Sequence, residues 1–362
     1  MKKALFFSPY LNTPGGGEVY CLNAAACLQD LDYSIHLAWK DQPALTRTLK
    51  LLDISLKYQL DPIAFAHFTT RTNLLSRLAH QRSYDLIFFL SDGSLPFLFS
   101  RHNLLHFQVP FTHLKPNLIS KLKLTTIDTI VCNSQFTKQI IDRQLAVDSS
   151  VIYPPINFRP PPSQGAKQNI ILSVGRFTNA LHNKRQDILV NTFRTMVDTG
   201  LLGWELVLIG STLPGQPQTF ITSLRKSSQG YPIKLITNAP ASTISRYYGL
   251  AKIFWLATGY GTDEQTNPEA VEHFGIVTVE AMNAGAVPVV INKGGQKEII
   301  RHGQNGFLFD GREDLISHTQ KLIGHPPLLR ALAQQAMGDS QLFDLDHFRR
   351  RISELIKPSS LP

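Results

Sequence analysis

Short, uniformly apolar runs recur along this whole sequence, and turn-forming residues bound each of them. The first set is ALFFS, IHLAW, DLIFFL, NLLHFQ and TIVCNS, and the second set is NIILSVGR, ELVLIG, IKLITN, KIFWLA, VPVVI and GFLF. Runs with no polar face are typical of strands in a parallel sheet, because helices cover both faces of such a sheet. Longer helical patterns alternate with the runs. The sequence therefore predicts an α/β architecture that is built twice.

A proline-rich stretch separates the two sets of runs. NFRPPPSQGAKQN, residues 157–169, combines three consecutive prolines with Ser, Gly and Gln, which is typical of a stiff linker. A chain of 362 residues also exceeds the usual size of one folding unit. We therefore expect an N-terminal domain over residues 1–161, a C-terminal domain over 162–340, and a C-terminal helix over 341–362. The apolar spacing of this last helix allows it to pack back on the N-terminal domain.

Charge and cysteine usage narrow the class of protein. The formal charge of 36 − 27 = +9 favours contact with anions such as nucleotides, phospholipid surfaces or nucleic acid. The three cysteines form no CxxC pattern, which argues against a disulfide framework and a zinc site. Prolines interrupt the apolar start too early for a secretory signal, and no stretch approaches the ~18 apolar residues of a membrane span. A cytoplasmic protein is the default expectation, with peripheral membrane contact left open.

The first stretch with chemical promise is SPYLNTPGGGEVYCLNAAACL, where a strand runs into three glycines and then a helix. Gly15, Gly16 and Gly17 lack the β-carbons that keep a ligand away from the backbone. The helix that follows presents free N–H groups and the positive end of its dipole. This segment suits a phosphate or a sugar, and the alternative is a tight strand-to-helix turn.

The second stretch is SVGRFTNALHNKRQDILV. We expect a buried strand to end at Val174 and a helix to begin near Arg185, with Arg176 and Lys184 in the polar loop between them. Ligands of open α/β sheets bind at the carboxyl ends of the strands, and two fixed cations there suit a diphosphate. A solvated basic loop is the alternative.

The third stretch is EHFGIVTVEAMNAGAVPVV, in which Glu272 and Glu280 flank the start of a predicted helix. We expect this helix to begin near Gly275 or Ile276, with its amino-terminal amides available to an anion. Asn283 and Gly285 are expected to end it, before the buried run VPVVI. The alternatives are a helix-dipole partner for Glu272 and a solvent-facing helical side chain for Glu280.

These stretches resemble the retaining glycosyltransferases of family 4. The resemblance covers nearly the whole chain, through the Gly-Gly-Gly-Glu turn, VCNSQFTKQII, VIYPPINF, SVGRFTNALHNKRQD and EHFGIVTVEAMNAGAVPVVINKGGQKEIIRHGQNGFLF. The last segment contains the family's pattern of two glutamates with seven residues between them, and it is the most specific signal. The resemblance implies the GT-B fold, in which two Rossmann-like domains face each other across a cleft.

The resemblance also implies roles for residues of the C-terminal domain. Glu280 would hydrogen-bond the ribose hydroxyls of a nucleotide sugar, and Glu272 would contact the donor sugar near its anomeric carbon. Backbone amides for the sugar and the diphosphate would come from Phe274, Gly275 and Ile276.

Further implied roles lie in both domains. Arg176 and Lys184 would neutralise the leaving diphosphate, and Gly16 and Gly17 would let the first domain close over the phosphates. His106, in NLLHFQVPF, resembles the first-domain histidine that meets the donor sugar. Two alternatives for it stay open: a core histidine beside an apolar run, and a competing histidine at position 102.

The segment 257–272 is longer and more polar than the family pattern leads us to expect. Its acidic residues have metal-ligand chemistry, but we favour a mobile acceptor loop there over a metal site. The resemblance implies a reaction that is independent of metal and needs no cofactor besides the nucleotide-sugar substrate. The acidic residues are Asp263, Glu264 and Glu269.

The predicted function is therefore transfer of a hexose from a nucleotide sugar to a glycan or a lipid-linked acceptor. EHFGI and GGQKEII resemble the mannosyltransferases of the family, which favours GDP-mannose over UDP and ADP sugars. An epimerase of nucleotide sugars on the same fold is one alternative. A non-catalytic basic protein that binds nucleic acid is another, although the chain contains no recognised nucleic-acid motif.

The stretch FTHLKPNLISKLKLTTI, residues 111–127, mixes lysines with leucines. Such a mixture predicts an amphipathic surface that lies on anionic lipid, where a lipid-linked acceptor would be found. An ordinary solvated helix is the alternative. The residues concerned are Lys115, Lys121 and Lys123, with Leu114, Leu118, Leu122 and Leu124.

Overall fold

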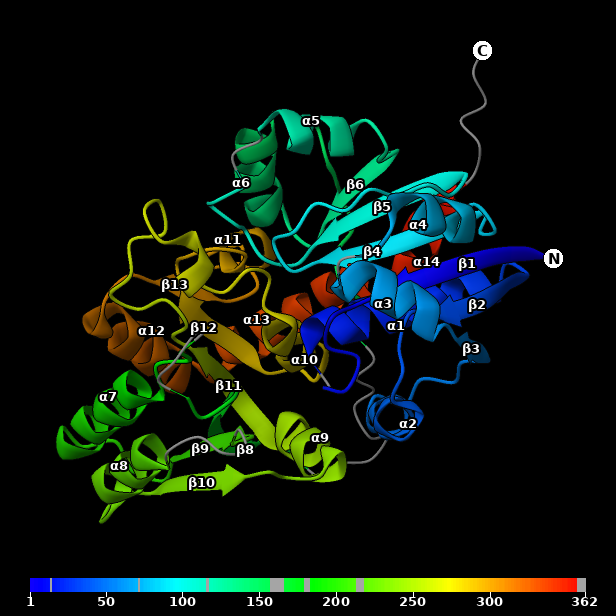
Figure 1. Ribbon diagram of the computed structural model, residues 1–362. Coiled ribbons are helices and arrows are strands. Elements are labelled where there is room, and N and C mark those ends of the chain that lie inside the picture. Colours follow the sequence, from blue (N-terminus) through cyan, green and yellow to red (C-terminus); the bar gives the residue numbers. More distant parts are fainter. Residues whose placement is uncertain are drawn as a thin grey trace. The chain divides into compact units, whose positions relative to one another are not determined.

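The computed structural model describes residues 1–13, 15–70, 72–114, 117–156, 166–178, 183–212 and 218–356. The chain divides into two compact units, which Figure 1 colours from blue to red along the sequence. Unit 1 is Met1–Asn157 together with Phe343–Pro362, and unit 2 is Phe158–Leu342. Our expected divisions, after residues 161 and 340, differ from these by four and by two residues, and the first falls outside the described part of the chain.

Unit 1 contains a parallel sheet of seven strands in the order β3-β2-β1-β4-β5-β6-β7. Its strands are β1 Lys2–Phe7, β2 Tyr33–Leu37, β3 Tyr58–Leu60, β4 Leu86–Ser91, β5 His102–Phe107, β6 Thr129–Cys132 and β7 Ser150–Val151. Its helices are α1 Gly16–Gln29, α2 Gln42–Leu51, α3 Pro62–Thr69, α4 Leu74–Gln81, α5 Leu118–Leu124, α6 Gln135–Leu145 and α14 Leu345–Ile356.

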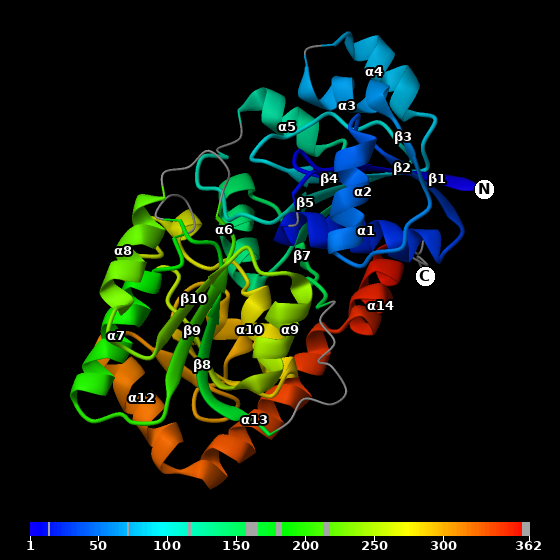
Figure 2. The same cartoon turned by 90° about the horizontal axis from the view of Figure 1, so that it is seen from below.

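The sheet of unit 1 is buried on both faces, as its uniformly apolar strands require. Along β1, Ala4 and Phe6 pack on one face, where α1 and α2 cover the sheet. The alternate residues of β1 pack on the opposite face with parts of α3 and α6. The C-terminal helix α14 lies beside α1 (Figure 2), and the ring of Phe348 stands perpendicular to that of Tyr20 at 5.0 Å. The terminal helix therefore adds to the core of unit 1.

Unit 2 contains a parallel sheet of six strands in the order β10-β9-β8-β11-β12-β13. Its strands are β8 Gln168–Val174, β9 Glu205–Gly210, β10 Ile233–Thr237, β11 Ala251–Leu256, β12 Val287–Ile291 and β13 Phe307–Phe309. Its helices are α7 Gln186–Asp198, α8 Thr219–Ser228, α9 Ala241–Leu250, α10 Ile276–Asn283, α11 Gln296–Ile299, α12 Arg312–Gly324 and α13 Pro326–Ser340. Two 3-10 turns, Pro268–Ala270 and Gln341–Phe343, complete the elements.

Unit 2 is also a sheet between two helical layers. Helices α7, α8 and α12 share one apolar cluster with Ile253 and Trp255 of β11. Phe254, between them, turns to the other face, where its ring lies 6.2 Å from that of Tyr248 in α9. In the described residues no helix is both long and apolar enough to cross a membrane.

The eleven apolar runs each contain a strand of the structure. The sequence patterns did not identify β3 and β7, which have three and two residues and lie at the two edges of their sheet. Edge strands this short bury little surface, so their sequences show no apolar run. The predicted ends are close: β8 ends at Val174, α7 begins one residue after Arg185, and α10 begins at Ile276 and ends at Asn283.

Candidate functional site

The carboxyl end of β8 is built for close packing. A β-carbon on Gly210, at the end of the neighbouring β9, would lie 1.9 Å from the carbonyl oxygen of Gly175, so only glycine fits there. The buried side chain of Gln186 donates from its Nε2 to the carbonyls of Gly175 and Arg176, at 3.3 and 3.0 Å. The backbone that carries Arg176 is therefore fixed from two sides. The Arg176 side chain itself is exposed.

Lys184 reaches across this strand end to Glu272. Its Nζ lies 2.6 Å from Oε2 of Glu272, and the two side chains are 15% and 16% exposed. The stem of Lys184 packs on Gly175, where a β-carbon would lie 2.8 Å from Cγ of the lysine. Removal of either partner from a pair this little exposed would leave the other without its ion-pair partner. A ligand phosphate would compete with Glu272 for the same ammonium.

Helix α10 begins beside this pair with a glycine that the geometry requires. Gly275 has φ +110°, a left-handed conformation, and no side chain of the described residues caps the helix. A β-carbon there would lie 1.9 Å from Nε2 of Gln296. The fully buried Gln296 amide donates to the carbonyl of Phe274 at 3.2 Å and accepts from the hydroxyl of Thr278 at 2.9 Å. The first turn of α10 is thus held rigidly with its amide groups uncapped by side chains.

Two further glycines fix the backbone around Glu272. The amide of Gly295 donates to the carbonyl of Glu272 at 2.9 Å. A β-carbon on Gly294 would lie 2.1 Å from that same oxygen, and one on Gly295 would lie 2.5 Å from Cα of Phe274. The backbone of the segment after β12 therefore packs directly on the backbone of residues 272–274. A larger residue in place of Gly294 or Gly295 would displace residues 272–274.

Glu280 lies one turn into α10 and is partly exposed. Its Oε2 accepts from the hydroxyl of Tyr248 at 2.8 Å. Although the side chain is partly exposed, the surrounding protein displaces much of the water around its carboxyl group. This disfavours the charged form and raises the pKa of Glu280 to about 7, while the hydrogen bond from Tyr248 opposes that shift. Glu280 is four positions after Ile276, so both lie on one face of the helix. Unit 2 thus brings Lys184, Glu272, Gly275 and Glu280 to one region around the start of α10.

The glycine turn of unit 1 precedes α1, whose amino-terminal cap, Gly15, offers no side chain. A β-carbon on Gly17 would lie 3.3 Å from Cδ1 of Leu90 and 3.7 Å from Cγ of Gln108. A β-carbon on Gly16 would meet nothing within 4 Å among the described residues. The fold therefore has no steric need for glycine at Gly16, and the position faces open space.

His106 is where the structure departs from the role we expected. Its side chain is fully buried on β5 and stacks on Tyr20, with ring centroids 3.8 Å apart. Burial lowers the pKa of His106 to about 3, because the charged imidazolium would be without hydration there, so the ring is neutral. This burial matches the core histidine that we kept as the alternative, and contact of His106 with a donor sugar stays a prediction. The competing His102 is partly exposed at the opposite, amino-terminal end of β5.

Gln108, just past the end of β5, occupies the surface position next to Gly17. Its Nε2 lies 2.7 Å from Nε2 of His106, and its Oε1 accepts from Nδ2 of Asn133 at 3.0 Å. Asn133 also donates to the backbone carbonyl of Gln108 at 3.1 Å. His106 therefore supports Gln108 from below, and the segments after β5 and β6 are joined by neutral amides.

The segment 257–272 is tied to its surroundings by charged groups. Glu264 accepts from the amide of Gly294 at 2.7 Å and pairs with Lys297. Arg185 donates to the carbonyl of Tyr260, and Lys293 donates to that of Thr262. No group of three or more His, Cys, Asp or Glu side chains in the described residues is arranged to hold a metal ion. The segment is thus a structured loop that hydrogen bonds and an ion pair connect to Arg185, just before α7, and to residues 293–297 around the start of α11.

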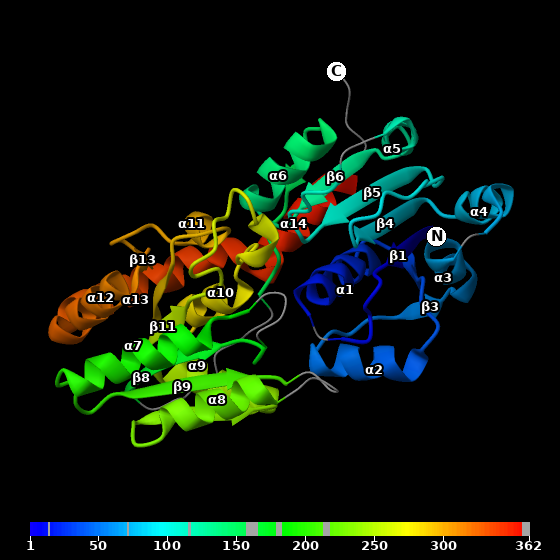
Figure 3. The same cartoon turned by 60° about the vertical axis from the view of Figure 1, so that its left-hand side comes forward.

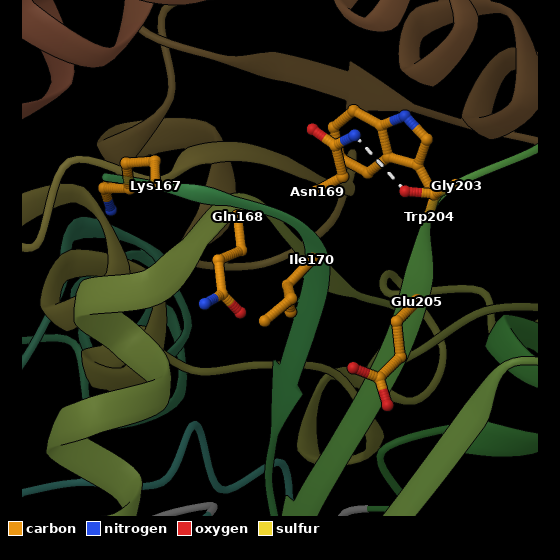
Figure 4. Close-up of a pocket in the computed structure, with 7 residues that line it drawn as sticks. All are labelled: Lys167, Gln168, Asn169, Ile170, Gly203, Trp204 and Glu205. Carbon is orange, nitrogen blue, oxygen red and sulfur yellow. Dashed lines mark hydrogen bonds between the residues drawn. The ribbon is translucent and has the colours of Figure 1, made fainter. Parts of the chain in front are cut away.

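A pocket of about 520 Å³ lies at the opposite edge of unit 2, along the amino-terminal ends of β8 and β9 (Figure 4). In it, Nδ2 of Asn169 donates to the carbonyl of Gly203 at 3.2 Å. Lys167 at its border donates to the carbonyls of Ala251 and Ala284, at 2.8 and 2.6 Å, which stabilises the C-terminal ends of α9 and α10. Burial lowers the pKa of Lys167 to about 8. None of the predicted site residues lines this pocket.

Sequence patterns missed the residues that hold the site in place. Tyr248 hydrogen-bonds Glu280, and Gln296 hydrogen-bonds the carbonyl of Phe274 next to Gly275. Gln186 hydrogen-bonds the carbonyl of Arg176, and Gln108, which lies nearer the surface, contacts His106. Only the two-residue spacing of Gln108 from His106, on the same face of a strand, was available as a signal. The other contacts depend on tertiary packing. Of the loop that bears Lys184, residues 179–182 lie outside the described part of the chain.

Two family models match this chain. Residues 157–338 match the glycosyl transferases group 1 model, and residues 14–160 match the Glycosyltransferase Family 4 model. The first match alone covers half of the sequence and contains the region around α10.

Curated relatives and solved structures agree with these matches. A GDP-Man:Man(3)GlcNAc(2)-PP-Dol alpha-1,2-mannosyltransferase of Dictyostelium discoideum is 23% identical over 61% of this chain and 44% of its own length. A D-inositol 3-phosphate glycosyltransferase of Rhodococcus jostii is 35% identical over 22% of this chain and 18% of its own. The aligned segments thus span less than half the length of these relatives.

The structural matches cover whole chains. HepE of Anabaena, solved with UDP and glucose, has a TM-score of 0.72 at 20% identity and 100% coverage of both chains. A glycosyltransferase of Rickettsia africae has a TM-score of 0.74 at 18% identity and 99% coverage of both. These neighbours have the GT-B fold, and the two Rossmann-like units described above have the same architecture. The chain belongs to the group 1 glycosyltransferases, of the family 4 type.

Proposed function

We propose that this glycosyltransferase moves a hexose, with retention of anomeric configuration, from a nucleoside diphosphate sugar to a hydroxyl of a glycan or a lipid-linked acceptor. The observation that carries the proposal is the Lys184–Glu272 pair at the uncapped start of α10, with Glu280 one turn farther along. A cation suits a diphosphate, amides that no described side chain caps suit a sugar, and a carboxylate suits the ribose hydroxyls.

The donor that we favour is GDP-mannose. The relatives with the widest alignments, from Dictyostelium discoideum and two species of Xenopus, are named for GDP-mannose and a dolichol-linked glycan. HepE was solved with UDP-glucose, so UDP sugars are the main competitors. The relatives' dolichol-linked substrate also supports a lipid-linked acceptor for this chain.

In the proposed reaction, the bond between the anomeric carbon and the diphosphate oxygen breaks, and its electron pair goes to that oxygen. The acceptor oxygen bonds to the anomeric carbon on the same face, and its proton passes to the leaving phosphate. Lys184, Arg176 and the first amides of α10 stabilise the charge that grows on the leaving group. We propose that these groups act without a divalent cation, so a chelator should leave the rate unchanged.

The first test is a thermal-shift screen of nucleoside diphosphates and their sugars, because a ligand that binds only the folded state raises the melting temperature. GDP and GDP-mannose should give the largest shifts. Transfer is then followed with the best donor, and the anomeric configuration of the product is read by NMR. Absence of a shift with every nucleotide would contradict the proposed site, and an inverted product would contradict retention. Conversion of donor alone into an epimer would indicate an epimerase.

The second test separates the two glutamates. Glu280→Ala should weaken nucleoside diphosphate binding, because it removes the acceptor for the ribose hydroxyls. Glu272→Ala should keep that binding or tighten it, because it releases Lys184 from its ion pair, and yet abolish transfer. Equal loss of nucleotide affinity in both variants would disprove this division of roles.

A further inference from the structure

Helix α5 of unit 1 exposes its largest apolar side chains. Leu118, Ile119 and Leu122 are 84%, 60% and 58% exposed, and no residue of this helix is buried. Of the other leucines in the lysine–leucine stretch, Leu114 is buried, and Leu124 packs against the apolar cluster beneath it. Three adjacent large apolar side chains in water are unfavourable unless something covers them.

Helix α4 also exposes apolar side chains, and hydrogen bonds to the segment 93–100 connect its end to the end of α5. Leu74 and Leu75 of α4 are 49% and 74% exposed. The segment 93–100 connects the helices: the amide of Phe99 donates to Oε1 of Gln81 at the end of α4, at 3.0 Å, and the amide of Leu98 donates to Oγ1 of Thr126 just beyond α5, at 3.3 Å.

The connecting segment also presents aromatic rings. Phe97 and Phe99 are partly exposed and stack with an interplanar angle of 6°, and Nζ of Lys123 lies over the Phe97 ring. Helix α5 and this segment pack on the sheet face opposite α1, as Figure 3 shows for α5, and α4 contacts α3, which packs on that same face. We call the exposed apolar residues of α4 and α5, together with Phe97 and Phe99, the α4–α5 surface.

The charge of these parts of the sequence has one sign. Residues 93–127 contain four cations and no Asp or Glu, and residues 62–84 contain three cations and no Asp or Glu. Lys121 of α5 is exposed beside the leucines. Lys115 and Arg71 belong to these cations by sequence but lie outside the described residues. The α4–α5 surface therefore combines exposed apolar groups with an excess of positive charge.

We propose that the α4–α5 surface binds the headgroup region of an anionic lipid bilayer. Leucine and isoleucine side chains enter the boundary between headgroups and acyl chains, while the lysine ammonium groups stay among lipid phosphates. Asp85, which pairs with Arg101 at 3.2 Å, and the exposed Asp92 border this surface, but α4, α5 and residues 93–100 contain no acidic residue. A soluble protein partner would explain the apolar groups but would not require that absence. The lipid-linked nature of the acceptor follows from this surface only together with the proposed function.

Co-sedimentation with phosphatidylcholine vesicles, with and without phosphatidylglycerol, tests the proposal. The parent protein should bind only the vesicles that contain phosphatidylglycerol, and added salt should weaken the binding. The combined variant Leu118→Ser, Ile119→Ser, Leu122→Ser should lower the partition coefficient at least about tenfold. Lys121→Gln and Lys123→Gln should each lower it about fivefold, as expected for one cation near an anionic surface.

The matched control is Leu202→Ser in unit 2, because Leu202 is also 84% exposed but lies outside the surface. It should leave lipid binding unchanged. The proposal is overturned if the control loses as much binding as the triple variant, if the triple variant binds like the parent, or if the parent binds neutral vesicles equally well. It is also overturned if, without lipid, the parent is an oligomer that the triple variant dissociates, since the surface would then join copies of this chain.

Nucleotide binding distinguishes this failure from failure of the proposed function. The triple variant should keep the parent's thermal shift with nucleoside diphosphates, which also shows that it is folded. If neither protein shows a nucleotide shift but the parent still binds anionic vesicles, the proposed function fails and the surface stands. If both shift and neither binds vesicles, the α4–α5 proposal fails alone.

Discussion

The carboxyl edges of the two sheets differ in chemistry although the sheets share one parallel architecture. In unit 2, the segments after β8 and β11 bring Lys184 and Glu272 within 2.6 Å of each other beside the start of α10. In unit 1, the segments after β5 and β6 join the neutral amides of Gln108 and Asn133 above a buried, uncharged His106.

The difference shows that one fold supports two kinds of recognition. In unit 2, the ammonium group of Lys184, now paired with Glu272, offers an anion a charge-assisted interaction. Neutral amides bind more weakly but impose direction. We therefore expect the cations of unit 2 to dominate affinity for the diphosphate, and the neutral amides of unit 1 to contribute little to it.

The sharpest test of this comparison removes the cations of unit 2. Lys184→Ala and Arg176→Ala should each lower turnover about 100- to 1,000-fold, or roughly 3 to 4 kcal/mol, because their interaction grows with the charge of the leaving group. Arg176→Lys should keep partial activity, since it retains the charge but loses the planar fork. Initial transfer rates at saturating donor measure this effect.

Arg225→Ala is the control, since Arg225 is also exposed in unit 2 but on α8, away from the strand edge. Nucleoside monophosphate, which lacks the β-phosphate, should bind all variants more nearly alike. Parental turnover in both alanine variants would place these cations in a solvated loop and remove the basis of the comparison.

Gly275→Ala tests whether the start of α10 is as constrained as its contacts indicate. A side chain at φ +110° costs about 1–3 kcal/mol, and moving the buried Gln296 amide adds a similar amount. Urea denaturation should show this loss of the free energy of unfolding.

Two other glycines give the contrast. Gly338→Ala, within α13 and without neighbours, should stabilise the protein by about 0.5–1 kcal/mol. The family resemblance gives Gly16 a role at the donor phosphates, so Gly16→Ala should reduce transfer. Stability should stay intact, because a β-carbon at this position meets no described atom within 4 Å. A stable, fully active Gly16→Ala protein would mean that the glycine turn of unit 1 connects strand and helix without a role in donor binding.

His106 and Gln108 test the weaker, uncharged edge. His106→Leu should lower the free energy of unfolding by about 1–3 kcal/mol, because it leaves Nε2 of Gln108 without its buried partner. Gln108→Ala should cost less stability and should lower turnover more, because Gln108 is the residue at the surface. The reverse pattern, with His106 controlling turnover at unchanged stability, would restore the histidine to the donor site.

Glu280 gives an effect that depends on pH. Its folded pKa of about 7 is above the ordinary value of 4.5, so the native state holds the proton more tightly. This contribution to stability is complete below pH 4.5 and is lost as the pH rises through 7, with a slope of at most about 1.4 kcal/mol per pH unit. Between pH 5 and pH 7, the parent should therefore lose stability relative to Glu280→Gln.

Nucleotide binding should show the opposite trend, because the carboxylate accepts the ribose hydroxyls better than the acid does. Affinity for the nucleoside diphosphate should increase as the pH rises from 6 to 8 in the parent but not in Glu280→Gln. Isothermal titration at several pH values measures this. A flat profile in the parent would mean that Glu280 titrates well below 7 or does not meet the nucleotide.

The sequence alone determined the architecture and the positions of the site segments. Eleven apolar runs became strands, and the ends of β8 and the start of α10 fell at or next to the expected residues, because burial on both faces and glycine turns leave plain local signals. Spacing also placed Glu272 before α10 and Glu280 within it.

Tertiary structure alone decided how these residues are partnered. The pair of Lys184 with Glu272 spans 88 positions, and the hydrogen bond from Tyr248 to Glu280 spans 32. No local pattern predicts a contact between elements so far apart in the sequence, since a polar residue that makes the contact has the same local pattern as one that does not. The same limit applies to His106, because the sequence pattern of a strand does not show whether a histidine ring lies in the core or in solvent. The stacking of Tyr20 on the ring shows that His106 lies in the core.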